Sequence, residues 1–147
     1  MEEKSQEEQL MENNLLRWAV IVVVLAHGVG HIMGFMAAWT NVPMGFSDRP
    51  SLLSDTLTLD SAVGRVFGVL WLVAMVGFLV SVYGVLAHQD WWRTLMIAAA
   101  VLSLVVILPW WNTVTPGPRF GATLVNLVII AALLPPWGEQ IAHVIGS

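Results

Sequence analysis

The stretch AVGRVFGVLWLVAMVGFLVSVYGVLA, residues 62–87, decides the fold of this chain. Apart from Arg65 near its beginning it carries no charge, and apolar residues dominate it. A helix needs about 20 predominantly apolar residues to cross the hydrocarbon core of a bilayer, which is about 30 Å thick. The stretch is long enough, and it therefore predicts a transmembrane helix.

Three further apolar runs lie on either side of it, at residues 15–39, 91–111 and 120–135. The first two of these also have the length of a full span, whereas the last is short and gains length from the flanking Arg119 and Trp137. We therefore expect an all-α protein, a four-helix transmembrane bundle over residues 15–136. One long loop connects its first and second helices.

Composition supports a membrane protein and excludes several other classes. The 147 residues are 57% hydrophobic and 11% charged, with a mean hydropathy of +0.76, whereas soluble domains carry about 25% charged residues. The net charge of -4, with only six Lys and Arg residues, speaks against a nucleic-acid partner. Because the chain has no cysteine, disulfides, iron–sulfur clusters, thiolate zinc sites and cysteine nucleophiles are excluded.

The segments outside the four runs have distinct patterns. Residues 1–14, MEEKSQEEQLMENN, predict an acidic, solvated N-terminal tail, and this acidity favours a retained first helix over a cleaved signal peptide. The loop over residues 40–61 is too long for a plain connection in a compact bundle, which indicates a short interfacial helix or a lid. Residues 137–147 form an amphipathic tail with Ile141, Val144 and Ile145 on one face, expected to lie on the membrane surface.

Tryptophan and arginine positions bear on the placement in the membrane. Indole rings favour the headgroup zone, and seven of the eight tryptophans lie at the ends of the four runs: Trp18, Trp91, Trp92 and Trp137 on the side of the termini, and Trp39, Trp110 and Trp111 on the other. The basic residues divide evenly between the two sides. Since Arg17 and Arg93 lie directly at helix ends, we expect a multi-pass protein of the cell membrane with both termini in the cytoplasm.

Two histidines lie within the first predicted span. His27 and His31 are four positions apart, so both imidazoles project from one helical face. Gly30 and Gly34 share or border that face and allow another helix or a flat ligand to approach closely. Ionisable side chains inside a membrane are costly and point to a functional site by default. The pair is therefore the first candidate site.

Several interpretations of this pair remain open at the level of the sequence. The two histidines ligate a metal ion, or one of them is an axial haem ligand, or they relay protons or bind a polar substrate or a quinone headgroup. Alternatively, they hydrogen-bond across helices to Asn126 or to a backbone carbonyl. The four expected spans contain no Asp or Glu, and His88 and His143 lie in a turn and in the tail. A complete zinc site is therefore not expected from this chain alone.

A second candidate site lies near the membrane face opposite the termini. It groups Arg65, Trp39, Asn112 and Arg119, with Asn126 further into the fourth span, as a substrate or headgroup pocket. The simpler interpretation is that both arginines snorkel to headgroup phosphates and that Asn126 makes an interhelical hydrogen bond. Gly77, Ser81 and Gly84 form a stripe of small residues on the second helix, suited to contacts within the bundle or to oligomerisation.

The pattern as a whole resembles a known kind of membrane protein. The motifs are His27-x3-His31-x2-Gly34-Phe35, Gly68-x2-Trp71-Leu72, Trp91–Trp92, and Trp111 with Gly121 and Asn126. Over residues 15–135 they resemble a family of small bacterial four-helix integral membrane proteins, labelled hypothetical or permease-like. The turn between the second and third helices is often basic in that family, whereas here it offers only Arg93. Since no activity is established for the family, the resemblance implies a fold and membrane residence.

Three functions follow as expectations. The first is a non-catalytic accessory or binding subunit of a membrane complex, with other subunits or further copies of itself as partners. The second is a haem- or metal-binding electron-transfer or quinone-linked component that uses His27 and His31. The third is a carrier of a small molecule or lipid. A phosphate loop, a Gly-x-Ser-x-Gly elbow and a His-Glu-x-x-His motif are all missing, so the chain is not expected to be an enzyme of those classes.

Overall fold

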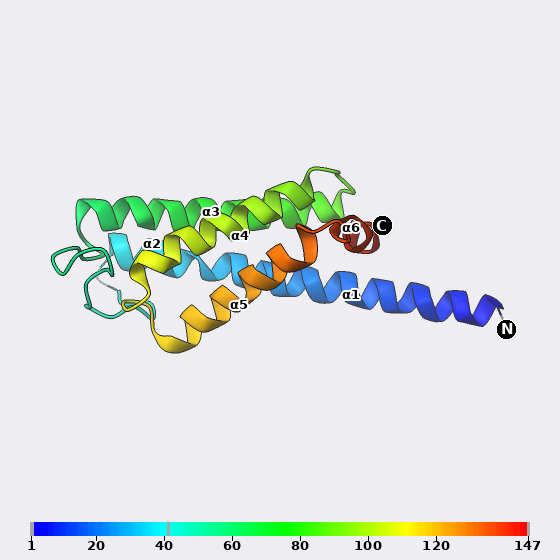
Figure 1. Ribbon diagram of the computed structural model, residues 1–147, viewed down its shortest axis with the longest axis horizontal. Coiled ribbons are helices and arrows are strands. Elements are labelled where there is room, and N and C mark those ends of the chain that lie inside the picture. The colour runs from blue at the N-terminus through cyan, green and yellow to red at the C-terminus, as the bar shows by residue number, and fades with distance from the viewer. Residues whose placement is uncertain (1, 41, 147) are drawn as a thin grey trace.

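The computed structural model describes residues 2–40 and 42–146 of the chain. Met1, Asn41 and Ser147, which belong to the expected tails and loop, lie outside the described residues. The elements are α1 (Glu2–Gly30), α2 (Ile32–Trp39), α3 (Ala62–Leu86), α4 (Trp92–Ile107), the 3-10 helix η1 (Leu108–Trp110), α5 (Pro116–Leu133) and α6 (Gly138–Gly146) (Figure 1). Four candidate spans, with α1 and α2 taken together, are long and apolar enough to cross a membrane. The predicted all-α fold with four such helices is confirmed.

Helix boundaries differ from the expected ones for local reasons. Helix α1 begins at Glu2, so the acidic residues expected as a tail continue the first helix, and this part projects beyond the bundle (Figure 1). Helix α4 changes to η1 at Leu108, directly before Pro109, which has no N–H to continue the α-helical hydrogen bonds. Helix α5 starts with Pro116, since proline suits the first helical turn.

The long helices form a row in which each packs on the next. Helices α1 and α2 pack on α3, α3 packs on α4, and α4 packs on α5. Helix α5 runs obliquely, and the main partners of its packing are α4 and α6 rather than α1 (Figure 1). Helix α5 therefore packs less extensively on α1 and α2 than on α4.

Small residues on α3 let α4 approach closely. A Cβ atom at Gly77 would lie 3.0 Å from Ala99 Cβ, and one at Gly84 would meet the side chains of Trp91 and Trp92. Ser81, between them, is fully buried and donates its hydroxyl to the Gly77 carbonyl at 2.7 Å. The stripe of small residues therefore makes a contact inside the bundle.

The tryptophans divide between the surface and the core. Exposed fractions are 55% for Trp18, 49% for Trp39, 42% for Trp91 and 57% for Trp137. Two others, Trp92 and Trp110, are buried in two hydrophobic clusters at opposite ends of the bundle. These two indoles fill space between helices at the ends of the bundle.

The loop between α2 and α3 packs on the connection between α4 and α5. Ser47 N donates to the Thr113 carbonyl at 2.8 Å, and Leu52 N donates to the Pro109 carbonyl at 2.7 Å. The described residues of 40–61 form turns and isolated bridges. The short helix expected here is therefore not formed in the described part of the loop, whose hydrogen bonds are made with the other loop instead.

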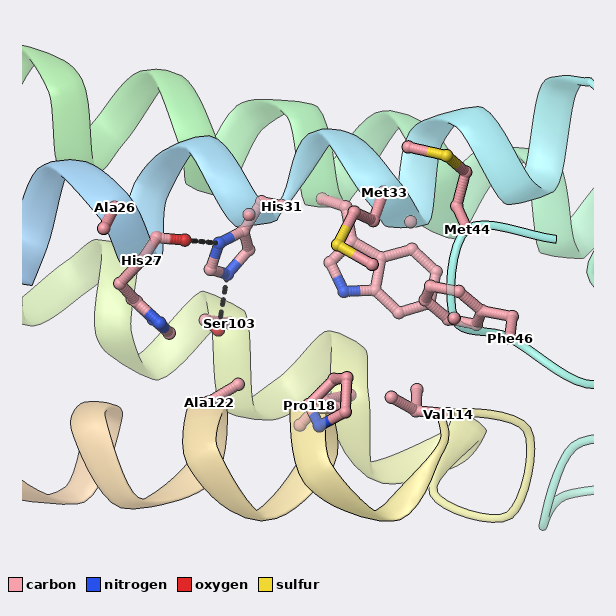
Figure 2. Close-up of a pocket in the computed structure, with 15 residues that line it drawn as sticks. Ala26, His27, His31, Met33, Met44, Phe46, Ser103, Val114, Pro118 and Ala122 are labelled. Atoms are coloured by element: carbon pink, nitrogen blue, oxygen red, sulfur yellow. Dashed lines mark hydrogen bonds between the residues drawn. The ribbon is translucent and has the colours of Figure 1, made fainter. Parts of the chain in front are cut away.

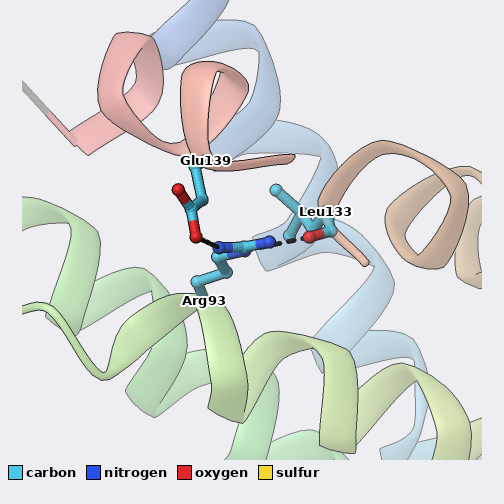
Figure 3. Close-up of polar contacts among 3 residues, drawn as sticks. All are labelled: Arg93, Leu133 and Glu139. Carbon is cyan, nitrogen blue, oxygen red and sulfur yellow. Dashed lines mark hydrogen bonds and ion pairs between the residues drawn. The ribbon is translucent and has the colours of Figure 1, made fainter. Parts of the chain in front are cut away.

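Helix α6 covers the end of the bundle from which α1 projects. Its residue Ile145 is 4% exposed and joins the core formed by α1, α3, α4 and α5. Arg93 Nε donates to the Leu133 carbonyl at 2.9 Å, and its Nη1 lies 3.8 Å from the Glu139 carboxylate (Figure 3). The apolar face of the expected amphipathic tail thus packs on the bundle.

Candidate functional site

The site begins with a local break in the first long helix. His31 Nδ1 lies 2.9 Å from the backbone oxygen of His27, and because a carbonyl only accepts, Nδ1 carries the hydrogen and donates it. The His31 amide, which would take this carbonyl in a regular helix, bonds to the Gly28 carbonyl at 3.0 Å. The imidazole therefore displaces a backbone bond, and α1 ends beside it.

A polar network joins this break to two other helices. His31 Nε2 lies 2.7 Å from Ser103 Oγ on α4, and Asn126 Nδ2 on α5 donates to the same oxygen at 2.7 Å. Asn126 Oδ1 in turn lies 2.9 Å from His27 Nε2. Figure 2 shows both histidines on α1 and at its break, with Ser103 on the facing helix. We call His27, His31, Ser103 and Asn126 the polar network.

The donor and the acceptor in each bond of the network follow once His31 is neutral. No Asp or Glu occurs in α2, α3, α4 or α5, and none in α1 beyond Glu12, so a buried imidazolium at His31 would lack an acidic partner. Neutral His31 keeps its hydrogen on Nδ1, and its Nε2 therefore accepts from the Ser103 hydroxyl. Ser103 Oγ is thus free to accept from Asn126.

The remaining bonds then follow in turn. Asn126 uses its amide N–H toward Ser103, so its Oδ1 accepts from His27, and His27 carries its hydrogen on Nε2. Each bond has one donor and one acceptor, and the backbone oxygen of His27 closes the circuit by accepting from His31. The network is self-consistent with both imidazoles neutral.

Burial makes this network a defined part of the core. The exposed fractions are 0% for Asn126, 1% for Ser103 and 6% for His31. The buried ring of Phe78 supports both imidazoles, with ring centroids 4.9 Å from His27 and 5.4 Å from His31. Buried polar groups are stable when all are hydrogen-bonded, and such networks then hold their members in one geometry.

A cavity of about 200 Å³ lies beside the network, between α1/α2, α4, α5 and the loop (Figure 2). His27, His31 and Ser103 form its polar wall. The rest of the wall is mainly apolar and contains Met33, Met44, Phe46, Trp71, Ile107, Val114, Pro118 and Ala122. The loop thus contributes directly to the wall of the cavity.

The arrangement does not resemble a metal or haem site. Within the described residues no group of three or more His, Asp or Glu side chains is suitably placed to hold a metal ion. Both ring nitrogens of His31 are engaged, as is Nε2 of His27, so ligation there would break the network. The cavity is also smaller than the pockets of roughly 300–1,000 Å³ that usually hold drug-sized ligands.

Ser103 and His31 are also arranged like the nucleophile and the general base of some enzymes. A hydroxyl that donates to a neutral imidazole is the arrangement by which a general base activates a nucleophile. Here Ser103 is 1% exposed, and its oxygen is already bonded to both His31 and the Asn126 amide. The geometry is that of a link between helices.

The other expected site residues lie in separate places. Trp39 Nε1 donates to the Arg65 carbonyl at 3.1 Å, and the Arg65 guanidinium lies 5.7 Å from the Trp39 ring. Arg119 donates to the Trp111 carbonyl at 2.9 Å and stacks near that ring. Asn112 is exposed. Asn126 belongs to the polar network, so the five residues do not surround one pocket.

Sequence reasoning did not single out Ser103. The only signal in the sequence is that, after Thr94, Ser103 is the one polar residue of α4. Asn126, in contrast, was considered as a hydrogen-bond partner of the histidines, and the structure shows this contact. No protein-family model, curated protein or solved structure matches this chain, so the functional argument rests on the site itself.

Proposed function

We propose that this chain resides in the cell membrane, crosses it with four helices and has both termini in the cytoplasm. Support comes from the outer helix faces, where valine and leucine side chains are about half exposed: Val22, Val66, Val73, Val76, Val105, Leu124, Leu127 and Val128. Soluble monomers rarely expose contiguous apolar surface on this scale. Arg17 and Arg93, at the end of the bundle near both termini, favour a cytoplasmic location of that end.

Cysteine labelling tests this topology, since the chain has no native cysteine. We expect a membrane-impermeant maleimide to label Asp55→Cys in intact cells, and to label Gln9→Cys and Gln140→Cys only after permeabilisation. All three positions are exposed, which makes permeabilised cells the control. Labelling of all three from outside would contradict four spans. The opposite pattern would contradict the orientation alone.

For the function itself, we propose a non-catalytic binding subunit that holds a small, largely apolar molecule in the cavity beside the polar network. The observation that carries this proposal is the cavity, because an apolar space with a few convergent polar groups is the usual form of a ligand site. The network needs no ligand to satisfy its own bonds, so it shapes one wall in advance. The ligand then serves either transport within a membrane complex or its regulation.

The position of the cavity favours entry from the lipid. It lies between α1/α2 and α5, which pack on each other less extensively than on their other neighbours. Gly30 lines it, is exposed, and has no heavy atom within 4 Å of where a Cβ would be. A molecule dissolved in the bilayer therefore reaches the cavity sideways, past Gly30.

Benzene is a suitable probe, because dry apolar cavities of about 150 Å³ bind it. We expect saturating benzene to raise the unfolding midpoint of the purified protein in detergent by about 2–4 °C. The variant Gly30→Leu, whose side chain fills the cavity, is expected to lose this shift. Thermal unfolding followed by circular dichroism measures both.

Gly121→Leu provides a matched control. Gly121 on α5 also has open space around it, but it does not line the cavity, so this variant is expected to keep the shift. An equal benzene shift in the wild type and in Gly30→Leu would mean that benzene acts through the micelle. That result would contradict a ligand site in the cavity.

A further inference from the structure

The polar network leaves one acceptor in the cavity wall. Because His27 carries its hydrogen on Nε2, where it donates to Asn126, its Nδ1 has a lone pair and no hydrogen. Within the described residues Nδ1 has no hydrogen-bond partner, and it is not among the fully covered unpaired atoms. His27 lines the cavity. Its Nδ1 is therefore an acceptor that a ligand can reach.

Trp71 leaves one donor in the same wall. Its indole lines the cavity, stacks against Gly34, and packs edge-to-face on Phe46 with ring centroids 5.3 Å apart. The described residues offer no hydrogen-bond partner to its Nε1–H, which is also absent from the fully covered unpaired atoms. An indole N–H only donates. A ligand atom that accepts can therefore bond to it.

We propose that the ligand is a small alcohol or phenol, whose hydroxyl group donates its hydrogen to His27 Nδ1, with Trp71 Nε1 as a donor elsewhere in the same wall. This inference rests on the proposed binding function. A hydroxyl is both donor and acceptor, so it matches either group of the wall, whereas a carbonyl or ether oxygen only accepts and leaves His27 unused. The apolar remainder of the molecule lies along Ile107, Val114 and Ala122.

The other polar side chains of the site offer a ligand no further hydrogen to accept. The hydrogens of Ser103 and of both histidines are used within the network, and the amide of Asn126 is fully buried. Met33 and Met44 add only thioethers, which are weak acceptors. Among side-chain groups in the wall, Trp71 is thus the one donor available to a carbonyl ligand.

The test compares three six-membered rings of nearly equal shape. Cyclohexane has no polar group, cyclohexanone has an acceptor, and cyclohexanol has both a donor and an acceptor. From the concentration dependence of the unfolding midpoint, with Gly30→Leu as the baseline for micelle effects, we expect cyclohexanol to bind about three- to tenfold more tightly than cyclohexanone. Equal affinities would overturn the hydroxyl assignment.

Two variants test whether His27 is the residue that makes the cavity prefer the alcohol to the ketone. In His27→Leu the alcohol is expected to lose its advantage over the ketone, whereas His143→Leu, outside the cavity, keeps it. If His27→Leu does not fold, nitrogen-15 NMR of histidine-labelled wild-type protein decides the same point, because it distinguishes the two neutral tautomers. We expect the hydrogen of His27 on Nε2; finding it on Nδ1 would overturn the assignment.

Different results with the three rings would contradict this inference and the proposed function. Binding of cyclohexane and of both oxygenated rings with the same affinity would remove the hydroxyl assignment and leave the cavity as an apolar binding site. Binding of none of the three would remove the proposed function itself.

Discussion

Replacement of Gly34 by alanine is expected to lower the free energy of unfolding by about 1–3 kcal/mol, the usual cost of added volume in a packed core. A Cβ at this position would lie 2.6 Å from Trp71 Cγ, well inside van der Waals contact. The indole is 4% exposed and packs against Phe46, so moving away from Gly34 would disturb that contact. Denaturation in mixed detergent micelles measures the change.

Gly30→Ala is the matched control, one turn earlier in the chain. No heavy atom lies within 4 Å of a Cβ there. Alanine at such a position reduces the freedom of the unfolded chain, so we expect unchanged stability or a gain of about 0.4–1 kcal/mol. Equal stabilities of the two variants would show that Trp71 does not pack on Gly34. The cavity wall would then differ from the one described.

The second large effect is expected at Asn126. Asn126→Leu keeps the size of the side chain but leaves His27 Nε2 without its acceptor and Ser103 Oγ without its donor. Interhelical hydrogen bonds in membranes average about 0.6 kcal/mol, and an unpaired buried polar group costs about 1–3 kcal/mol. We therefore expect a loss of about 1–3 kcal/mol in the free energy of unfolding, measured in the same micelles.

Thr123→Val is the control, because Thr123 lies on the same helix as Asn126 but outside the polar network. The Thr123 hydroxyl is buried and has no hydrogen-bond partner within the described structure, so its removal is expected to be neutral or stabilising. A wild-type stability for Asn126→Leu would mean that the circuit of bonds contributes nothing. The directional argument for the ligand would then lose its basis.

The number of long helices was predictable because hydropathy is a property of each segment on its own. Residues 62–87 could only form a helix if placed in lipid, since a lone span must satisfy its backbone hydrogen bonds internally. The spacing of His27 and His31 likewise placed both rings on one face. Their contact with Asn126 was one of several open alternatives, because spacing does not identify a partner.

Tertiary structure decided which residues meet. Ser103 meets His31 because α4 turns this face toward α1, an orientation that depends on packing between helices, such as that of Ala99 on Gly77, and not on a local pattern. Arg65 and Arg119 were expected in one pocket, yet each lies against its own tryptophan. Membership of one membrane face does not bring two side chains together.

An all-helical chain with four apolar helices and an inward pair of histidines could thus be predicted from the sequence, since these features depend on period and length along one segment. The cavity, the direction of its hydrogen bonds and the two unsatisfied groups in its wall were decided by the tertiary structure. The physical reason is that helix rotation and tilt are set by side-chain packing between segments distant in the chain. The packing of the Trp71 indole on Gly34 is one example.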